Sequence, residues 1–180
     1  MADQSQIDIH PTCIVCVEAS LTGEVTIGAG TVIQPNATLR ATNGPIRIGE
    51  RCLVEENVLI ENMNEDGSPL IIGDDNVFEV GAVVHARSVG NNNVFSVLSI
   101  VGTNVDVTNG CCIGVRCSVM RHGELPCRTC VYGERNERRI SAEDPKPQTT
   151  ILEVIRKMMP SYHKLVVKRK VATSPDTSSA

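Results

Sequence analysis

Two pairs of closely spaced cysteines are the first candidates for a metal-binding site in this chain. Two residues separate Cys13 from Cys16, and two residues separate Cys127 from Cys130. Two such pairs resemble the ligand spacing of a zinc ribbon, in which four thiolates hold one structural zinc ion. Whether one ion can join both pairs depends on the distance that the fold puts between them.

Two histidines are candidates for general acid-base catalysis. The imidazole of His85 or of His122 could remove a proton from a hydroxyl or an amine and so activate an acyl acceptor. Neither histidine lies in an evident cofactor motif, and the sequence has no phosphate-binding loop and no Gly-rich dinucleotide motif. The sequence therefore predicts no catalytic residue, no metal ligand and no cofactor.

The elements that would position these side chains follow from an internal repeat of six residues. An aliphatic residue or Phe recurs every six positions, with short insertions after Leu39 and Ile60 and a one-residue slip after Val84. Neither a helix nor an alternating strand produces this period. The twenty repeat positions are Ile9, Val15, Leu21, Ile27, Ile33, Leu39, Ile48, Val54, Ile60, Ile72, Phe78, Val84, Val89, Phe95, Val101, Val107, Ile113, Val119, Leu125 and Val131.

Small side chains occupy a second position of most repeats, four residues after the aliphatic one. Small residues suit a tight corner, and Asn and Gly tolerate the left-handed backbone that such corners use, as in residues 73–76 and 90–93. At this corner position a thiol acts as a compact apolar group. The cysteines found there are Cys13, Cys52, Cys111 and Cys117.

This pattern resembles the hexapeptide repeat of left-handed parallel β-helices over residues 7–135. In that family three repeats form one triangular coil, so we expect an all-β solenoid of six to seven coils with an aliphatic core. Such a core accounts for the aromatic content, which is only 2% of 180 residues. Stacked coils lie about 4.8 Å apart, so the two cysteine pairs would be roughly 29 Å apart and could not share a zinc ion.

Composition and charge argue against two other classes of protein. The net charge is −4, but residues 135–170 hold ten Lys or Arg against four Asp or Glu, a balance of +6 that leaves −10 elsewhere. Nucleic acid binding would need broader basicity and aromatic platforms, so the basic segment is either solvated or in contact with an acidic protein surface. No apolar window or signal peptide is visible, so we expect a cytoplasmic protein without membrane insertion and with reduced thiols.

Three segments follow the repeat. Residues 136–147 are predicted to be a linker, residues 148–170 a C-terminal α-helix with a basic segment, and residues 171–180 a disordered tail. Ser174, which precedes a proline in that tail, is a candidate phosphorylation site. We expect Pro160 to end the helix. The apolar stripe of the helix should pack on the β-helix, or alternatively bind a partner, through Ile151, Leu152, Ile155, Met158 and Met159.

Two segments also resemble the γ-class carbonic anhydrases, which bind a catalytic zinc ion through three histidines between subunits. These segments are residues 39–49 and 56–60. The two family ligands that lie five residues apart fall on Val80 and His85, and residues 61–68, which would supply another, contain no histidine. One imidazole cannot hold a catalytic zinc ion. Carbonic anhydrase and hexapeptide acyltransferase activities are therefore kept only as alternatives.

The chain resembles the dynactin subunit 6 family along almost its whole length. Residues 72–81 and 90–94 carry this resemblance within the repeat, and residues 148–149, 155–160 and 162–163 carry it outside the repeat. The resemblance implies a non-catalytic scaffold in the pointed-end complex of dynactin, which helps dynein–dynactin engage adaptors and cargo along microtubules. The implied partners are dynactin subunit 5, which is a second β-helix, the pointed-end actin-related protein and dynactin subunit 4. The implied location is cytoplasmic and cytoskeleton-associated.

Overall fold

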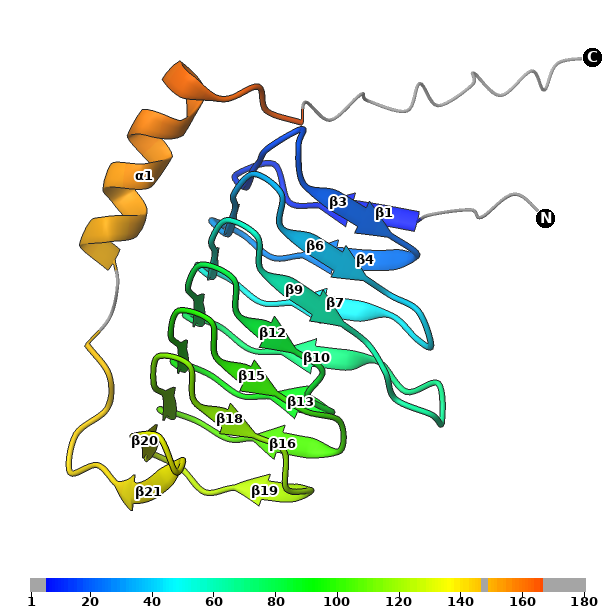
Figure 1. Ribbon diagram of the computed structural model, residues 1–180. Coiled ribbons are helices and arrows are strands. Elements are labelled where there is room, and N and C mark those ends of the chain that lie inside the picture. The colour runs from blue at the N-terminus through cyan, green and yellow to red at the C-terminus, as the bar shows by residue number, and fades with distance from the viewer. Residues whose placement is uncertain (1–5, 147–148, 167–180) are drawn as a thin grey trace, which may run out of the picture.

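The computed structural model describes residues 6–146 and 149–166, which form a left-handed parallel β-helix with one α-helix along its side (Figure 1). Each six-residue repeat supplies a short strand and a corner, and three repeats close one triangular coil. There are six complete coils and a seventh that has two parallel strands. The predicted fold class is confirmed.

Three sheets form the faces of the triangular prism. The first sheet contains β1 (Gln6–Ile9), β4 (Glu24–Ile27), β7 (Ile46–Ile48), β10 (Leu70–Ile72), β13 (Ser88–Val89), β16 (Val105–Val107) and β19 (Gly123–Leu125). The second sheet contains β2 (Ile14–Val15), β5 (Val32–Ile33), β8 (Leu53–Val54), β11 (Val77–Phe78), β14 (Val94–Phe95), β17 (Cys112–Ile113), β20 (Thr129–Tyr132) and β21 (Glu137–Ile140). The third sheet contains β3 (Ser20–Thr22), β6 (Thr38–Arg40), β9 (Leu59–Glu61), β12 (Val83–Val84), β15 (Ile100–Val101) and β18 (Ser118–Val119).

The repeat positions stack in three columns inside the prism. Parallel pairing places each repeat residue opposite its equivalent in the next coil, as Ile9 lies opposite Ile27 and Leu21 lies opposite Leu39. Eighteen of the twenty repeat side chains are buried. The other two, Ile9 and Leu21, are only partly buried because the first coil packs against a described coil on one side only.

The core also holds two aromatic rings. Phe78 and Phe95 face each other on adjacent coils, fully buried, with ring centroids 4.6 Å apart and ring planes within 13° of parallel. The spacing between coils is close to the distance at which two aromatic rings stack, so Phe residues at equivalent positions of adjacent coils can pack on each other.

The corners use a left-handed backbone three residues after many of the repeat positions. At the two predicted corner strings, Asp75 has φ 57° and Asn92 has φ 55°. Arg51, with φ 53°, and Leu98, with φ 58°, also adopt this conformation, although neither residue type favours it. The corner geometry is therefore imposed by closure of the coil, and the residue type adapts to it.

A ladder of buried asparagines joins successive coils at the corner between the first and second sheets. The amide nitrogen of Asn76 donates to the carbonyl oxygens of Gly73, at 2.9 Å, and Gly90, at 2.8 Å. The amide oxygen of Asn76 accepts a hydrogen bond from the backbone N–H of Asn93 at 2.9 Å. The side chain of Asn76 thus satisfies backbone groups of its own coil and of the next coil.

Helix α1 (Thr149–Tyr162) lies along the outer face of the second sheet (Figure 1). The side chain of Leu152 forms one buried apolar cluster with Val32, Leu53 and Val77, which belong to three successive coils. The guanidinium of Arg156 donates to the carbonyl oxygen of Thr12 in the first coil, at 3.0 Å, and to that of Gly30 in the second coil, at 2.8 Å. Among the described residues, no helix has the length and apolarity needed to cross a bilayer.

The apolar stripe of α1 is narrower than predicted. Leu152 and Met159 are buried and Ile155 is half-buried, but Ile151 is 50% exposed and Met158 is 51% exposed. Residues 152, 155 and 159 are spaced i, i+3 and i+7, so they lie along one side of the helix that a flat sheet can cover. Ile151 and Met158 each precede an end of this row and point about 100° away from it. The packing prediction is therefore wrong for Ile151 and Met158.

The end of α1 and the segment that precedes this helix both differ from the sequence-based expectation. Pro160 does not stop α1 but lies in its last turn, where the missing N–H removes only one hydrogen bond of the helix. Residues 137–140, predicted as part of the linker, form β21, which pairs antiparallel with β20 and covers the edge of the last coil. The predicted tail, residues 171–180, and the candidate phosphorylation site Ser174 lie outside the described residues.

Candidate functional site

The three faces of the prism present different outer surfaces. The second sheet is covered by α1 over its first four coils. The outward column of the first sheet is mostly polar and runs Asp8, Thr26, Arg47, Ile71, Ser88, Asp106 and Glu124. The third sheet has neighbouring apolar residues at the centre of its outward column, Leu59, Val83 and Ile100. The third sheet is thus the open apolar face.

An exposed apolar surface extends from this face around the adjoining corner. The five residues that define the apolar surface are between 37% and 62% exposed, and they are Val80, Leu98, Ile100, Val115 and Met120. Val80 and Leu98 stack at the corner, where the N–H of Leu98 donates to the carbonyl of Val80 at 3.0 Å. Large apolar side chains exposed together on successive coils are typical of an interaction site.

A polar cluster lies beside the apolar surface on the same face. Glu61 accepts a hydrogen bond from the Thr42 hydroxyl at 2.8 Å and forms an ion pair with Arg40 at 3.5 Å. The Nε2 atom of His85 is 3.7 Å from the second carboxylate oxygen of Glu61, which is too long for a hydrogen bond, and this nitrogen is buried without a partner. Parallel pairing brings these residues together from three coils.

The ligand count of this cluster decides what metal chemistry it can support. Glu61 and His85 offer one carboxylate oxygen and one imidazole nitrogen, and Val80, five residues before His85, offers an exposed isopropyl group instead of a ligand. A catalytic zinc ion needs three protein ligands and an open position. Glu61 and His85 leave such a site one ligand short within this chain.

His122, the other candidate base, lies far from this cluster. It is exposed at the last coil in a pocket of about 220 Å³ that it shares with Arg121, Glu124 and Arg138. Val105, Val119 and Leu125 also line this pocket. The structure therefore does not bring the two candidate histidines together.

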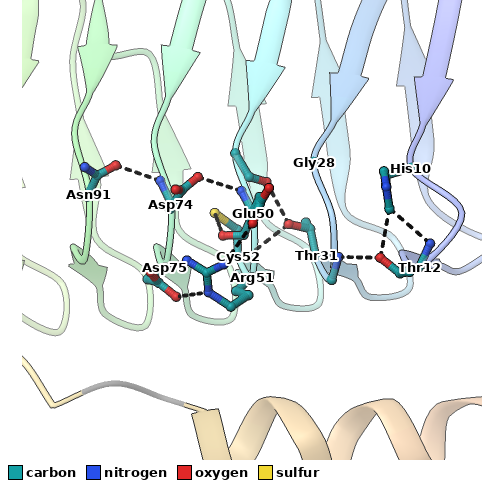
Figure 2. A network of polar contacts seen from close by, with 12 residues as sticks. His10, Thr12, Gly28, Thr31, Glu50, Arg51, Cys52, Asp74, Asp75 and Asn91 are labelled. Carbon is teal, nitrogen blue, oxygen red and sulfur yellow. Dashed lines mark hydrogen bonds and ion pairs between the residues drawn. The ribbon is translucent and has the colours of Figure 1, made fainter.

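The corner cysteines donate hydrogen bonds to the backbone. The thiol of Cys13 donates to the carbonyl of Gly28 at 2.9 Å, and the thiol of Cys52 donates to that of Gly73 at 3.2 Å. Burial raises the pKa of the Cys52 thiol to about 12, so the thiol stays protonated and remains a donor. Figure 2 shows Cys52 beside Thr31 of the preceding coil, whose hydroxyl oxygen accepts a hydrogen bond from the backbone N–H of Cys52 at 3.1 Å.

The two cysteine pairs lie at opposite ends of the β-helix. Cys13 and Cys16 flank β2 in the first coil, whereas Cys130 belongs to β20 in the seventh coil and Cys127 lies two residues before that strand. One zinc ion cannot reach both pairs. The structure does place Cys16 beside Glu18 and His163, a grouping that the sequence analysis missed because His163 lies beyond the repeat and has no spacing signal.

Comparisons with known proteins agree with this architecture. The chain is 41% identical to dynactin subunit 6 of Danio rerio over 97% of this chain and 95% of that protein. It is 40% identical to a carbonic anhydrase of Methanosarcina thermophila, over only 47% of this chain and 34% of that protein. A hexapeptide transferase family protein from Anaplasma phagocytophilum has the same fold, with a TM-score of 0.71 over 87% of this chain and 92% of that chain, at 17% identity. No family model matches the sequence.

The coil geometry and the repeat define a hexapeptide-repeat protein of the left-handed β-helix class. In this molecule one face of the prism is covered by a helix and another exposes an apolar surface beside a single histidine–carboxylate pair. The chain belongs to the dynactin subunit 6 family.

Proposed function

We propose that this protein is a non-catalytic scaffold subunit of the pointed-end complex of dynactin and that its apolar surface binds a neighbouring subunit. The proposed partners are dynactin subunit 5, the pointed-end actin-related protein and dynactin subunit 4. In this role the protein supports the engagement of adaptors and cargo by dynein–dynactin, in a cytoplasmic, cytoskeleton-associated complex. Membership in the dynactin subunit 6 family supports this proposal.

The observation that carries the proposal is the conformation and exposure of Leu98. Its φ is 58°, and its side chain, which belongs to the apolar surface, is 45% exposed. A non-glycine residue with this backbone costs about 1–2 kcal/mol, and Asn, which this protein uses at equivalent corners, tolerates the conformation better. Leu98 thus has an unfavourable backbone conformation and also exposes an apolar side chain to solvent. Contact of this side chain with a partner protein, which the isolated chain does not make, would explain both features.

Docking of a second β-helix fits the shape of this face. The third sheet is flat along the axis of the prism, and its outward apolar residues repeat from coil to coil. A partner with the same repeat can align its own coils with these residues, which allows side-by-side packing without rearrangement of the backbone. We therefore assign this face to dynactin subunit 5.

Two variants test the assignment through opposite effects on stability and binding. Leu98→Asn removes the apolar side chain and relieves the backbone cost, so we expect unchanged or higher thermal stability together with at least tenfold weaker binding to dynactin subunit 5. The control is Ile71→Asn, since Ile71 is 51% exposed on the outer face of the first sheet. Binding is measured by calorimetry, and the one-to-one complex by size exclusion with light scattering.

Two results would contradict the assignment. One is equal affinity of the wild type and Leu98→Asn for dynactin subunit 5. The other is a loss of binding in Ile71→Asn as large as in Leu98→Asn, which would place the contact elsewhere. A stable homotrimer that recovers no dynactin subunit from cytosol would overturn the scaffold proposal itself.

The enzymatic alternatives are tested on the same purified chain. With one imidazole and one carboxylate in the polar cluster, we expect no hydration of carbon dioxide above background with added zinc. We also expect no acyl transfer from acyl-coenzyme A to hydroxyl or amine acceptors. Activity in either assay that is lost in His85→Ala or His122→Ala would show that the protein is an enzyme.

A further inference from the structure

Three potential metal ligands meet where the C-terminal segment returns to the first coil. They are the thiol of Cys16, a carboxylate oxygen of Glu18 and a ring nitrogen of His163, and these three atoms lie within 4.8 Å of one another. This cluster is separate from the polar cluster on the third sheet, since Cys16 and Glu18 follow β2 in the first coil. His163 reaches them from the end of α1.

Backbone hydrogen bonds hold the three ligands in this arrangement. Residues 163–166, here called the strap, run antiparallel to the first coil, with Leu165 bridged to Cys16. The N–H of Val17 donates to the carbonyl of Lys164 at 3.0 Å, and the N–H of Val166 donates to the carbonyl of Val15 at 2.8 Å. The ligands are therefore positioned by paired backbone on both sides rather than by free loops.

The charges around Cys16 favour a bound cation over a free thiolate. The Cys16 side chain is buried, and the negative charges of Glu18 and Glu56 act on its thiol. The same carboxylates that oppose a thiolate attract a divalent cation, and the cation in turn compensates the thiolate. A bound metal ion would thus offset the repulsion between the Cys16 thiolate and the nearby carboxylates.

We propose that this cluster is a zinc site that fastens the strap to the first coil. Cys16, Glu18 and His163 are the three protein ligands, and a water molecule is the fourth. The combination of thiolate, imidazole and carboxylate is typical of zinc and unlike the all-oxygen sites of calcium and magnesium. Tetrahedral zinc needs ligand atoms about 3.3–3.8 Å apart, so the side chains must close by about 1 Å.

Binding exchanges a proton for the metal and involves no oxidation or reduction. The Cys16 thiol releases its proton to solvent as the Zn–S bond forms, while the His163 ring nitrogen and the Glu18 carboxylate each donate a lone pair to the metal. Because the strap follows α1 directly, zinc also stabilises the docked helix against local opening.

Titration of the metal-free full chain with zinc tests the proposal. By calorimetry we expect one bound zinc ion per chain, with about one proton released per ion. Cobalt in place of zinc should show a thiolate-to-metal absorption band. We expect Cys16→Ser to abolish this band and His163→Ala to weaken zinc binding at least tenfold. The controls are Cys127→Ser, which alters an exposed thiol outside the cluster, and His85→Ala, which alters the polar cluster of the third sheet.

Hydrogen exchange supplies a readout that does not depend on folding of the Cys16 variant. We expect zinc to slow exchange of the Val17 and Val166 amides in the wild type and not in His163→Ala. The proposal is overturned if zinc binds at less than one equivalent, or if His163→Ala binds zinc as tightly as the wild type. It is also overturned if His85→Ala or Cys127→Ser removes the site.

Discussion

Replacing Leu152 by alanine should release α1 from the β-helix, while the same change one residue earlier should not. Leu152 is 7% exposed and is the buried helix residue of the cluster with Val32, Leu53 and Val77, so truncation removes buried apolar contact between α1 and the sheet. Burial of such a side chain contributes about 1.5–3 kcal/mol, and loss of about 2–3 kcal/mol lowers the docking equilibrium roughly 30–150-fold. Ile151 is 50% exposed, so Ile151→Ala removes few contacts and should cost about 0.5 kcal/mol or less.

Hydrogen exchange on the helix amides separates these two outcomes, because docking protects them and the short helix frays without it. We expect exchange of α1 to become 30–150-fold faster in Leu152→Ala and to change by less than threefold in Ile151→Ala. Amides of the inner coils serve as the internal control, since the repeat packs independently of α1. Equal protection of the helix in both variants would refute the account of how α1 docks.

Four further outcomes are expected. Arg156→Leu leaves two carbonyls of the first and second coils without their donor and should loosen α1, with faster helix exchange and unchanged exchange of the inner coils. Asn76→Ala removes the donor and acceptor that join two coils and should lower the free energy of unfolding by about 2–4 kcal/mol in denaturant titrations. The Arg87 guanidinium lowers the pKa of Asp106, so their ion pair stabilises the fold at neutral pH. This contribution to stability is lost as the pH falls below about 4 and the carboxylate becomes protonated. In Arg87→Gln the pKa of the Asp106 carboxyl, measured by NMR, should be higher than in the wild type. Ser174→Ala should leave thermal unfolding unchanged, because the residue lies beyond the repeat, and a lower melting temperature would contradict this.

The period of six predicts the core because every coil reuses the same backbone pairing. Once one repeat residue points inward, the parallel register forces the equivalent residue of the next coil inward as well, as for Ile27 and Ile48. The two insertions do not disturb the register, since they occur at corners, where extra residues bulge outward. The twenty core positions follow from the sequence for this reason.

Features that depend on tertiary contact were less accessible from the sequence. The stripe of α1 has five apolar members, but which of them touches a flat sheet depends on the rotation of the helix, and Ile151 and Met158 are on its flank. The positive φ of Leu98 contradicts the residue preferences for that backbone, so no propensity predicts it. The grouping of Cys16 with His163 joins residues 147 positions apart (163 − 16) through a strap that the repeat does not specify.

The pairing of the strap with the first coil has a consequence during synthesis of the chain on the ribosome. Each coil pairs with its neighbour only about 20 residues away, so coils can form in order as the chain emerges. The outer edge of β2, however, pairs with residues 164–166, which emerge about 150 residues later. At 5–20 residues per second this strand edge stays open for roughly 7–30 s, long enough to pair with a neighbouring nascent chain on the same messenger RNA. The last described segment of the protein thus covers the outer edge of β2, and it can do so only after the rest of the β-helix has been synthesised.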